Sequence, residues 1–187
     1  MGVGLAANTF SELTNRAVTI SVPKVELINW DHSPILGELQ LGGHSVLRVS
    51  QGFSGDLVGD AMLVINDEGG RRLAEMLLGE GETLNSIDQN AQAALLELGN
   101  IVMNGIVGTL ANHLEIGVTY EIPVLQLRGV SEFVDLVSDL VDVSDTKVLL
   151  MRASLVLSSD KVSGYLMLLL RENSMNDLLA RLHKLAA

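Results

Sequence analysis

The feature that most constrains the fold of this chain is an internal repeat, in which the second half reproduces residues of the first. Shifts of 100 and 105 residues align identical residues, among them Val18 with Val118, Thr19 with Thr119, Pro23 with Pro123, Gly59 with Gly164 and Leu73 with Leu178. A glycine-rich run at 79–82 divides the 187 residues nearly in half. We therefore expect a single domain over 1–187, made of two pseudo-repeats at about 1–82 and 83–187.

Each half is predicted to contain the same elements: a helix, a short strand ending at a proline, an irregular or helical stretch, two strands and a closing helix. Alternating apolar and β-branched residues predict strands at 18–22, 45–49, 57–65, 118–122, 147–157 and 164–170. Helical spacing of apolar residues also predicts a helix at 131–141. Because hairpins connect antiparallel strands, we expect an α+β fold in which long helices pack on a largely antiparallel sheet.

The composition excludes several classes of function. Twelve Lys and Arg against 23 Asp and Glu give a net charge of −11, and the basic residues do not cluster, so we expect neither nucleic acid nor membrane as a partner. The absence of cysteine excludes disulfides and thiolate chemistry and fits a reducing cytoplasm. The run 148–157 is interrupted by Arg152, so it is not expected to span a bilayer.

A long helix is predicted from Ser86 to about His113, with Ser86 and Gln89 as a capping box. One side of this helix is predicted to face the core; its residues are Leu95, Gly99, Val102, Ile106, Leu110 and His113. The opposite side carries a narrow stripe of mostly polar residues, Asn90, Ala93, Glu97, Asn100 and Asn104.

Several other short motifs match known functional motifs in residue type and spacing but lack the surrounding features that those motifs require. Gly2-x-Gly4-x-x-Ala7 lacks the strand that precedes a dinucleotide-binding turn, and Ser21-x-x-Lys24 and Ser158-x-x-Lys161 lack their companion motifs. The histidines have no metal-ligand spacing; they are His32, His44, His113 and His183. We therefore expect no metal and no cofactor belonging to this chain.

Glu97 and Asn100 are the strongest candidates for chemistry. Three residues apart on a helix, their side chains are neighbours on one side. A neutral carboxamide both donates and accepts hydrogen bonds, so Asn100 can orient a water molecule but is no nucleophile. Such a pair suits a reaction whose nucleophile and metal come from elsewhere, and the plain alternative is a solvated polar stripe.

The spacing Glu97-x-x-Asn100, followed after 22 residues by Pro123, resembles the signature of the CheC/CheX/FliY family of bacterial chemotaxis phosphatases. The duplication is similar to that of CheC, and the run 17–25 reads like a strand of the family's first half. The resemblance implies a duplicated CheC-like fold and hydrolysis of the aspartyl phosphate of a CheY-like response regulator.

The resemblance also implies roles for the two candidate residues. Glu97 docks the partner by binding a lysine, and Asn100 enters the partner's active site and orients the attacking water, while Mg²⁺ belongs to the partner. The alternative is a non-catalytic CheC-like module that binds phosphorylated regulator, a CheD-type deamidase or the flagellar switch.

Two departures from the family pattern bear on these expectations. Ala93 stands where the family usually has Asp or Ser, four residues before the Glu. The first-half counterpart of Asn100 would lie one position before Met1, so we expect an in-frame Glu-x-x-Asn in the sequence upstream. Glu12-x-x-Asn15 has Glu38 rather than proline at the matching distance and is not expected to form a site.

Overall fold

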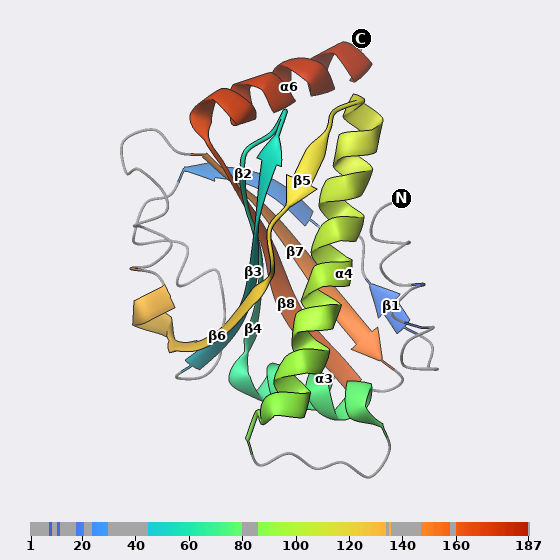
Figure 1. Ribbon diagram of the computed structural model, residues 1–187, viewed down its shortest axis with the longest axis vertical. Helices are drawn as coiled ribbons and strands as arrows, with labels where there is room; N and C mark the ends of the chain where they lie inside the picture. Colours follow the sequence, from blue (N-terminus) through green and yellow to red (C-terminus); the bar gives the residue numbers. More distant parts are fainter. Residues whose placement is uncertain are drawn as a thin grey trace.

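The computed structural model describes residues 8, 11, 18–20, 24–29, 45–79, 86–133, 135, 147–157 and 160–186. Within these ranges eight strands form one sheet: β1 (Val18–Ile20), β2 (Lys24–Asn29), β3 (Ser45–Gly55), β4 (Gly59–Asn66), β5 (Val118–Tyr120), β6 (Val124–Gly129), β7 (Lys147–Leu157) and β8 (Asp160–Leu170). The helices are α3 (Asp67–Leu78), α4 (Gln89–Leu114) and α6 (Glu172–Ala186). The long helix α4 crosses one face of the sheet, and α3 and α6 lie at its two ends (Figure 1).

Every strand pairing in the described sheet is antiparallel. The hairpins β3–β4 and β7–β8 meet through β4 and β8, while β5 and β6 pair with β3, and β1 and β2 pair with β7. The predicted α+β class with a largely antiparallel sheet is therefore confirmed. The strand order is unchanged when the two halves are exchanged, as a duplicated chain would produce. The duplication and its boundary near residues 82 and 83 stay a prediction, and 80–85 lie outside the described residues.

The six predicted strands correspond to β1, β3, β4, β5, β7 and β8, but β2 and β6 were not predicted. Both of these strands begin directly after a proline, which the sequence interpretation treated as a strand end. The chain instead resumes pairing beyond each proline, β2 with β7 and β6 with β3. Of the predicted helix 131–141, residues 131–133 and 135 are helical and the remainder lies outside the described residues.

Helix α4 forms much of the core, and the predicted face is confirmed at Leu95, Gly99 and Val102 but not further along the helix. Its buried residues are Ala91, Leu95, Leu98, Gly99, Val102, Met103, Val107, Ala111 and Leu114. Ile106 and Leu110 are only partly buried, and His113 is exposed, with Nδ1 2.9 Å from the Thr109 carbonyl oxygen. The prediction that His113 faces the core is wrong, because in the second half of α4 the buried side turns to Val107, Ala111 and Leu114.

The N-terminus of α4 also differs from the prediction. Asp88, rather than Ser86, is the N-cap, and its side chain accepts a hydrogen bond from the Ala91 N–H at 2.9 Å. By length and composition alone α4 is apolar enough to cross a membrane. Its packing against β3 and β4 is typical of a core helix, so this test is weak support for a membrane segment.

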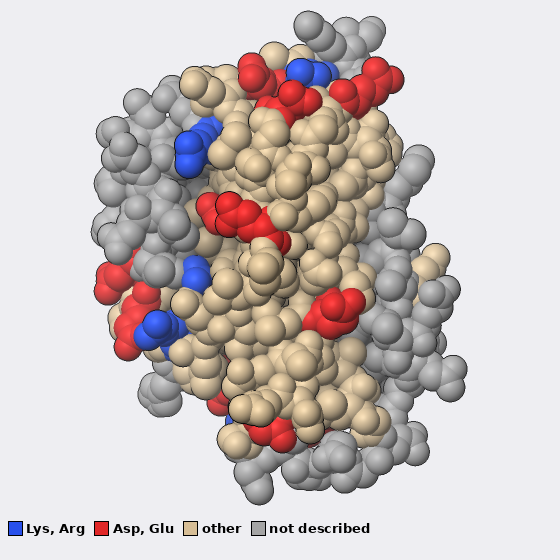
Figure 2. Space-filling model, in the orientation of Figure 1, with Lys and Arg blue, Asp and Glu red and all other residues tan. Residues whose placement is uncertain are grey.

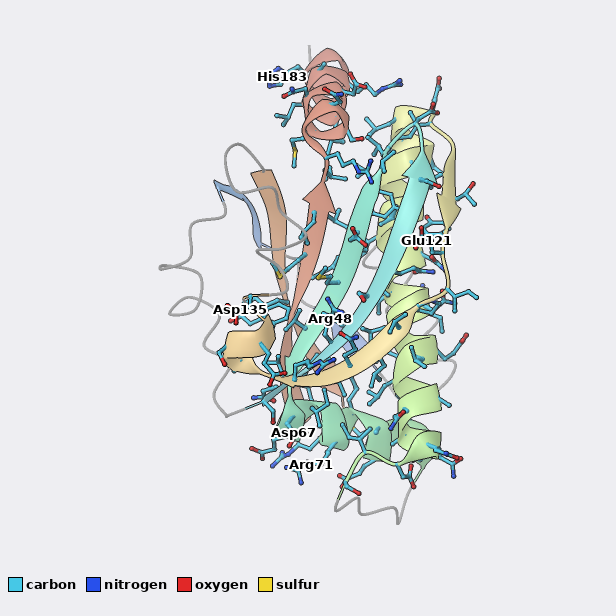
Figure 3. All side chains as sticks on the ribbon, turned by 60° about the vertical axis from the view of Figure 1, so that its left-hand side comes forward. Arg48, Asp67, Arg71, Glu121, Asp135 and His183 are labelled. Carbon is cyan, nitrogen blue, oxygen red and sulfur yellow. The ribbon has the colours of Figure 1, made fainter. Side chains whose placement is uncertain are left out.

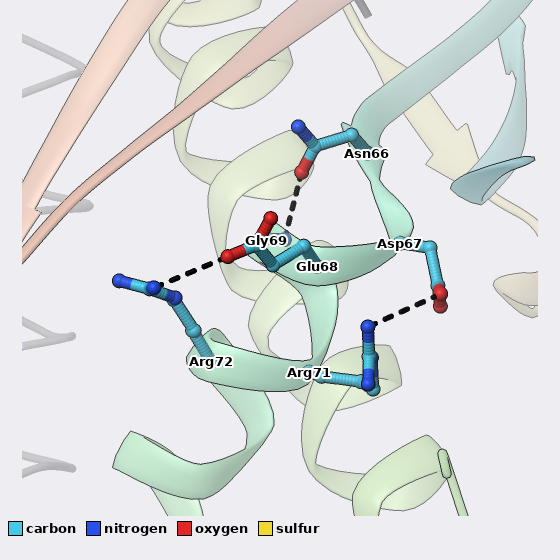
Figure 4. A network of polar contacts seen from close by, with 6 residues as sticks. All are labelled: Asn66, Asp67, Glu68, Gly69, Arg71 and Arg72. Carbon is cyan, nitrogen blue, oxygen red and sulfur yellow. Dashed lines mark hydrogen bonds and ion pairs between the residues drawn. The ribbon is translucent and has the colours of Figure 1, made fainter. Parts of the chain in front are cut away.

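Helix α3 begins with a capped and ion-paired first turn (Figure 4). The Asn66 side chain accepts a hydrogen bond from the Gly69 N–H at 2.7 Å, and such caps typically contribute about 1 kcal/mol. Arg71–Asp67 and Arg72–Glu68 are ion pairs at 3.6 and 3.1 Å, each four residues apart and solvent-exposed to some degree. These contacts stabilise the first turn of α3 and do not involve the candidate site.

Candidate functional site

Glu97 and Asn100 lie one turn apart in the middle of α4, as the sequence predicts for the pair. Glu97 is exposed, whereas Asn100 and Asn104 are half-buried where α4 approaches β3. Asn90 and Ala93 of the same stripe are exposed. Gly99 permits the close approach, because a Cβ there would lie 2.5 Å from Cγ1 of Val49. The glycine between the two candidate residues thus sets how near Asn100 lies to the sheet.

The Asn100 carboxamide takes part in a chain of hydrogen bonds from three elements. Its Oδ1 accepts from Nε2 of Gln51 on β3 at 3.1 Å and from Nδ2 of Asn104 at 2.9 Å. The same Gln51 Nε2 donates to the Glu121 carbonyl oxygen at 2.9 Å. Within the described part of the chain, Nδ2 of Asn100 has no hydrogen-bond partner and is not buried.

Gln51 was not predicted as a site residue, although the pattern of residues along β3 could have identified it. The β3 residues on either side of it on the same face are apolar, Leu47, Val49 and Phe53, so a buried polar side chain interrupts the row. Buried polar groups require partners, and Gln51 is only 3% exposed. The partners, however, come from residues 49 and 70 positions away along the chain.

A bulge beside Pro123 brings the Glu121 carbonyl to Gln51. Phe53 pairs with Tyr120 and Ser50 with Val124, so three residues, 121–123, lie opposite 51 and 52 of β3. Proline has no N–H to continue the ladder, and the Gln51 side chain binds the carbonyl at this interruption. The bulge pushes Ile122 outward to 87% exposure. Pro123 therefore contributes to the site through the shape of the backbone beside Gln51.

A cluster of charged residues occupies the other face of β3. Arg48 donates a hydrogen bond to Oε1 of Gln126, and desolvation by burial lowers its pKa despite the nearby Asp60 carboxylate. Burial raises the pKa of Asp60, and the Glu121 carboxylate raises it further, while Arg48 and Arg171 oppose the rise. Glu121, labelled in Figure 3, therefore contacts both faces of β3. Its backbone carbonyl accepts the hydrogen bond from Gln51, and its side-chain carboxylate lies next to Gly52.

The surface around Asn100 suits a macromolecular partner better than a small molecule. Large apolar side chains are exposed on the bulge and on β6, at Ile122, Val124 and Leu127. The face over α4 and β5 is largely uncharged, with separate acidic residues on it (Figure 2). Among the described residues, no group of three or more His, Asp or Glu side chains could hold a metal ion. The arrangement can position groups of another molecule, and it supplies neither a strong base nor a nucleophile.

Comparisons with known proteins find a matching family model and similar folds. The family model "Chemotaxis phosphatase CheX" matches residues 48–129, which include Gln51, Glu97, Asn100 and Pro123. FliY from Thermotoga maritima has a TM-score of 0.76 at 18% identity, covering 98% of this chain and 91% of that one. The CheX of a CheX–CheY–BeF3–Mg complex from Borrelia burgdorferi has a TM-score of 0.56 at 15% identity, covering 91% and 96%.

FliM is also similar in fold. The FliM of a FliM–SpeE complex from H. pylori has a TM-score of 0.62 at 11% identity and covers 97% of this chain and 88% of that one. The family match and these folds confirm the resemblance to the CheC/CheX/FliY family. The chain thus has the fold of FliY and CheX, and its residues 48–129 match the CheX family model.

Proposed function

We propose that this protein hydrolyses the aspartyl phosphate of a CheY-like response regulator in the cytoplasm. The observation that carries the proposal is the Asn100 carboxamide, held from inside by Gln51 and Asn104 and open to the surface one turn from exposed Glu97. The match to the CheX model covers this site, and one structural neighbour is a CheX in complex with CheY.

In the proposed reaction, the oxygen of a water molecule bonds to phosphorus as the bond from phosphorus to the regulator's aspartyl oxygen breaks. The products are the aspartate carboxylate and inorganic phosphate, which keeps the protons of the water. Phosphoryl transfer depends chiefly on positioning and on charge stabilisation. Asn100 would position the water, and the regulator's own Mg²⁺ would stabilise the phosphoryl charge.

Glu97 would dock the regulator by pairing with a lysine on its surface. The carboxylate is fully available, since Glu97 is exposed and makes no ion pair among the described residues. Ile122, 87% exposed beside the site, would add apolar contact with the same partner. Charge would then govern association and the carboxamide would govern the chemical step.

The alternative is a non-catalytic module that binds phosphorylated regulator, a CheD-type deamidase or the flagellar switch. The similarity in fold to FliY and FliM, with TM-scores of 0.76 and 0.62, fits this alternative. The exposed Ala93 in the polar stripe, where the family usually has a polar residue, favours it as well.

The test is the decay of a phosphorylated CheY from the same genome, with and without this protein and its variants. Asn100→Ala should slow the accelerated decay by about 10²–10³-fold, the usual loss for one positioned group, while binding persists. Asn112→Ala, an exposed asparagine on the same helix, is the matched control and should leave the rate unchanged. Unaccelerated decay despite binding would establish the non-catalytic module instead.

A further inference from the structure

The orientation of the Asn100 carboxamide can be worked out from one acceptor that cannot turn. An amide side chain can exchange its oxygen and nitrogen by rotation, so its direction has to be assigned from its neighbours. The Glu121 carbonyl is backbone, fixed by the bulge and by the hydrogen bond from the Glu121 N–H to the Gly52 carbonyl oxygen at 2.9 Å. It accepts only, so the group of Gln51 that faces it at 2.9 Å has to be the NH₂.

This assignment passes from Gln51 to Asn100. The same Nε2 lies 3.1 Å from the Asn100 side-chain atom, which therefore has to be the oxygen, and Asn104 adds a second donor to that oxygen at 2.9 Å. Reversing all three carboxamides would keep the two contacts of Asn100 but set the Gln51 oxygen against the Glu121 carbonyl. The observed direction has one more hydrogen bond and avoids that repulsion.

The consequence is a defined polarity at the surface. Both acceptor positions of Asn100 Oδ1 are occupied from inside, by Gln51 and Asn104, so its Nδ2 N–H groups are what the protein offers to a partner. Resting on the proposed function, we infer that Gln51 is a positioning residue that makes Asn100 a hydrogen-bond donor toward the attacking water or a phosphoryl oxygen. A water that accepts this bond keeps a lone pair free for phosphorus.

Three variants test this role against the rate of decay of the phosphorylated regulator. Gln51→Met removes the donor at similar volume and should lower kcat at least ten-fold with KM nearly unchanged. Gln51→Glu should lose activity further as pH rises, because the ionised carboxylate cannot donate to Asn100. Gln126→Met is the matched control, since Gln126 is a half-buried glutamine on β6 that binds Arg48 and does not contact Asn100. It should leave kcat unchanged.

Asn100→Asp tests the polarity itself. The carboxylate can still accept from Gln51 and Asn104 but presents an oxygen outward, so the rate should fall as far as in Asn100→Ala. Wild-type activity in Asn100→Asp, or an unchanged kcat in Gln51→Met, would overturn the inference while the proposed phosphatase function stood.

A measurement without the regulator separates this inference from the proposed function. In amide hydrogen exchange followed by NMR, the Gln51 Nε2 protons should be protected and the Asn100 Nδ2 protons should exchange rapidly with solvent. In Gln51→Met the chemical shifts of the Asn100 Nδ2 protons should change. In Gln126→Met the same chemical shifts should stay at their wild-type values. Protected Asn100 protons with exposed Gln51 protons would overturn the inference, whether or not the wild-type protein is a phosphatase.

Discussion

Strand β3 carries one buried polar side chain toward each face of the sheet, and the two are held in different ways. Gln51 faces α4 and belongs to a neutral chain of carboxamides that ends at the surface in Asn100. Arg48 faces the opposite side, bonds to Gln126 and lies near Asp60. Neighbouring residues of a strand point to opposite faces, so the odd spacing of three places these two side chains on opposite faces of the sheet. Glu121 is the residue that contacts both clusters.

The difference shows what each cluster is suited to do. The neutral chain has no group that titrates near neutral pH, so the direction of Asn100 is set by geometry alone. The charged cluster holds a half-buried carboxyl whose pKa is raised, so its cost to folding depends on pH. We expect changes on the Gln51 face to alter activity and changes on the Arg48 face to alter stability.

The largest effect is expected where α4 meets β3. Gly99→Ala would place a Cβ 2.5 Å from Cγ1 of Val49, so helix and strand would have to separate. Overpacking typically costs about 1–3 kcal/mol, and an approach of 2.5 Å to a β-branched side chain belongs to the upper part of that range, above the gain of about 1 kcal/mol in helix propensity. Urea unfolding should show the loss of stability, and the displaced Asn100 should lower the phosphatase rate.

Gly108→Ala is the matched control in the same helix. Its Cβ would meet only the Tyr120 hydroxyl, at 3.3 Å, which is the far end of a side chain. Stability should change little or rise by up to about 1 kcal/mol. Equal losses in both variants would show that glycine is needed along the whole helix and that close approach at Gly99 is not special.

Arg48→Met should lower the free energy of unfolding by about 1–2 kcal/mol, because it leaves the Gln126 side chain without its donor and removes the cation that most opposes the raised pKa of Asp60. Since the substitution lies on the face away from α4, kcat should stay at the wild-type value. Urea unfolding and the decay assay measure the two quantities. A drop in kcat at wild-type stability would show that the two faces are coupled.

Glu97→Gln addresses a carboxylate that lies wholly on the surface. Association with the regulator should weaken by about two- to five-fold, the range for an exposed ion pair, with kcat unaffected. Titrations at several salt concentrations should show a strong salt dependence for the wild type and a weak one for the variant. Glu115→Gln, at the exposed C-cap of α4, is the control, and an equal effect there would indicate only a general charge effect.

Asp60→Asn should have the smallest effect, and that effect should depend on pH. Because the folded pKa of Asp60 is raised, the folded state binds more protons than the unfolded state between the ordinary Asp value of about 4 and the raised value. Wild-type stability should therefore fall as pH rises through this window. The variant should remove that fall and be more stable than wild type at neutral pH.

Thermal unfolding across mildly acidic to neutral pH measures this difference. Asp177→Asn, an exposed position on α6, should show the wild-type pH dependence. An Asp60→Asn protein that is less stable than wild type at neutral pH would mean that the attraction between Asp60 and Arg48 outweighs the burial of the carboxyl.

The local sequence pattern was sufficient to predict part of this structure. The helix carrying Glu97 and Asn100 on one side follows from their spacing of three, and the strand at 147–157 follows from its apolar alternation. Each depends on contacts within one element or one hairpin. Predictions failed where burial of a side chain depends on the element that packs against it. Helical periodicity placed His113 in the core, but the packing of α4 on the sheet leaves it exposed.

The sequence by itself determined the α+β class, the antiparallel strands and the pair Glu97 and Asn100, because backbone propensity and residue spacing act over a few positions. The tertiary structure alone decided how Asn100 is oriented. Its direction depends on Gln51, 49 residues away, and on a backbone carbonyl at Glu121 that reaches Gln51 only through the bulge beside Pro123. A hydrogen bond between distant segments requires that the chain first be folded, so no local pattern encodes it.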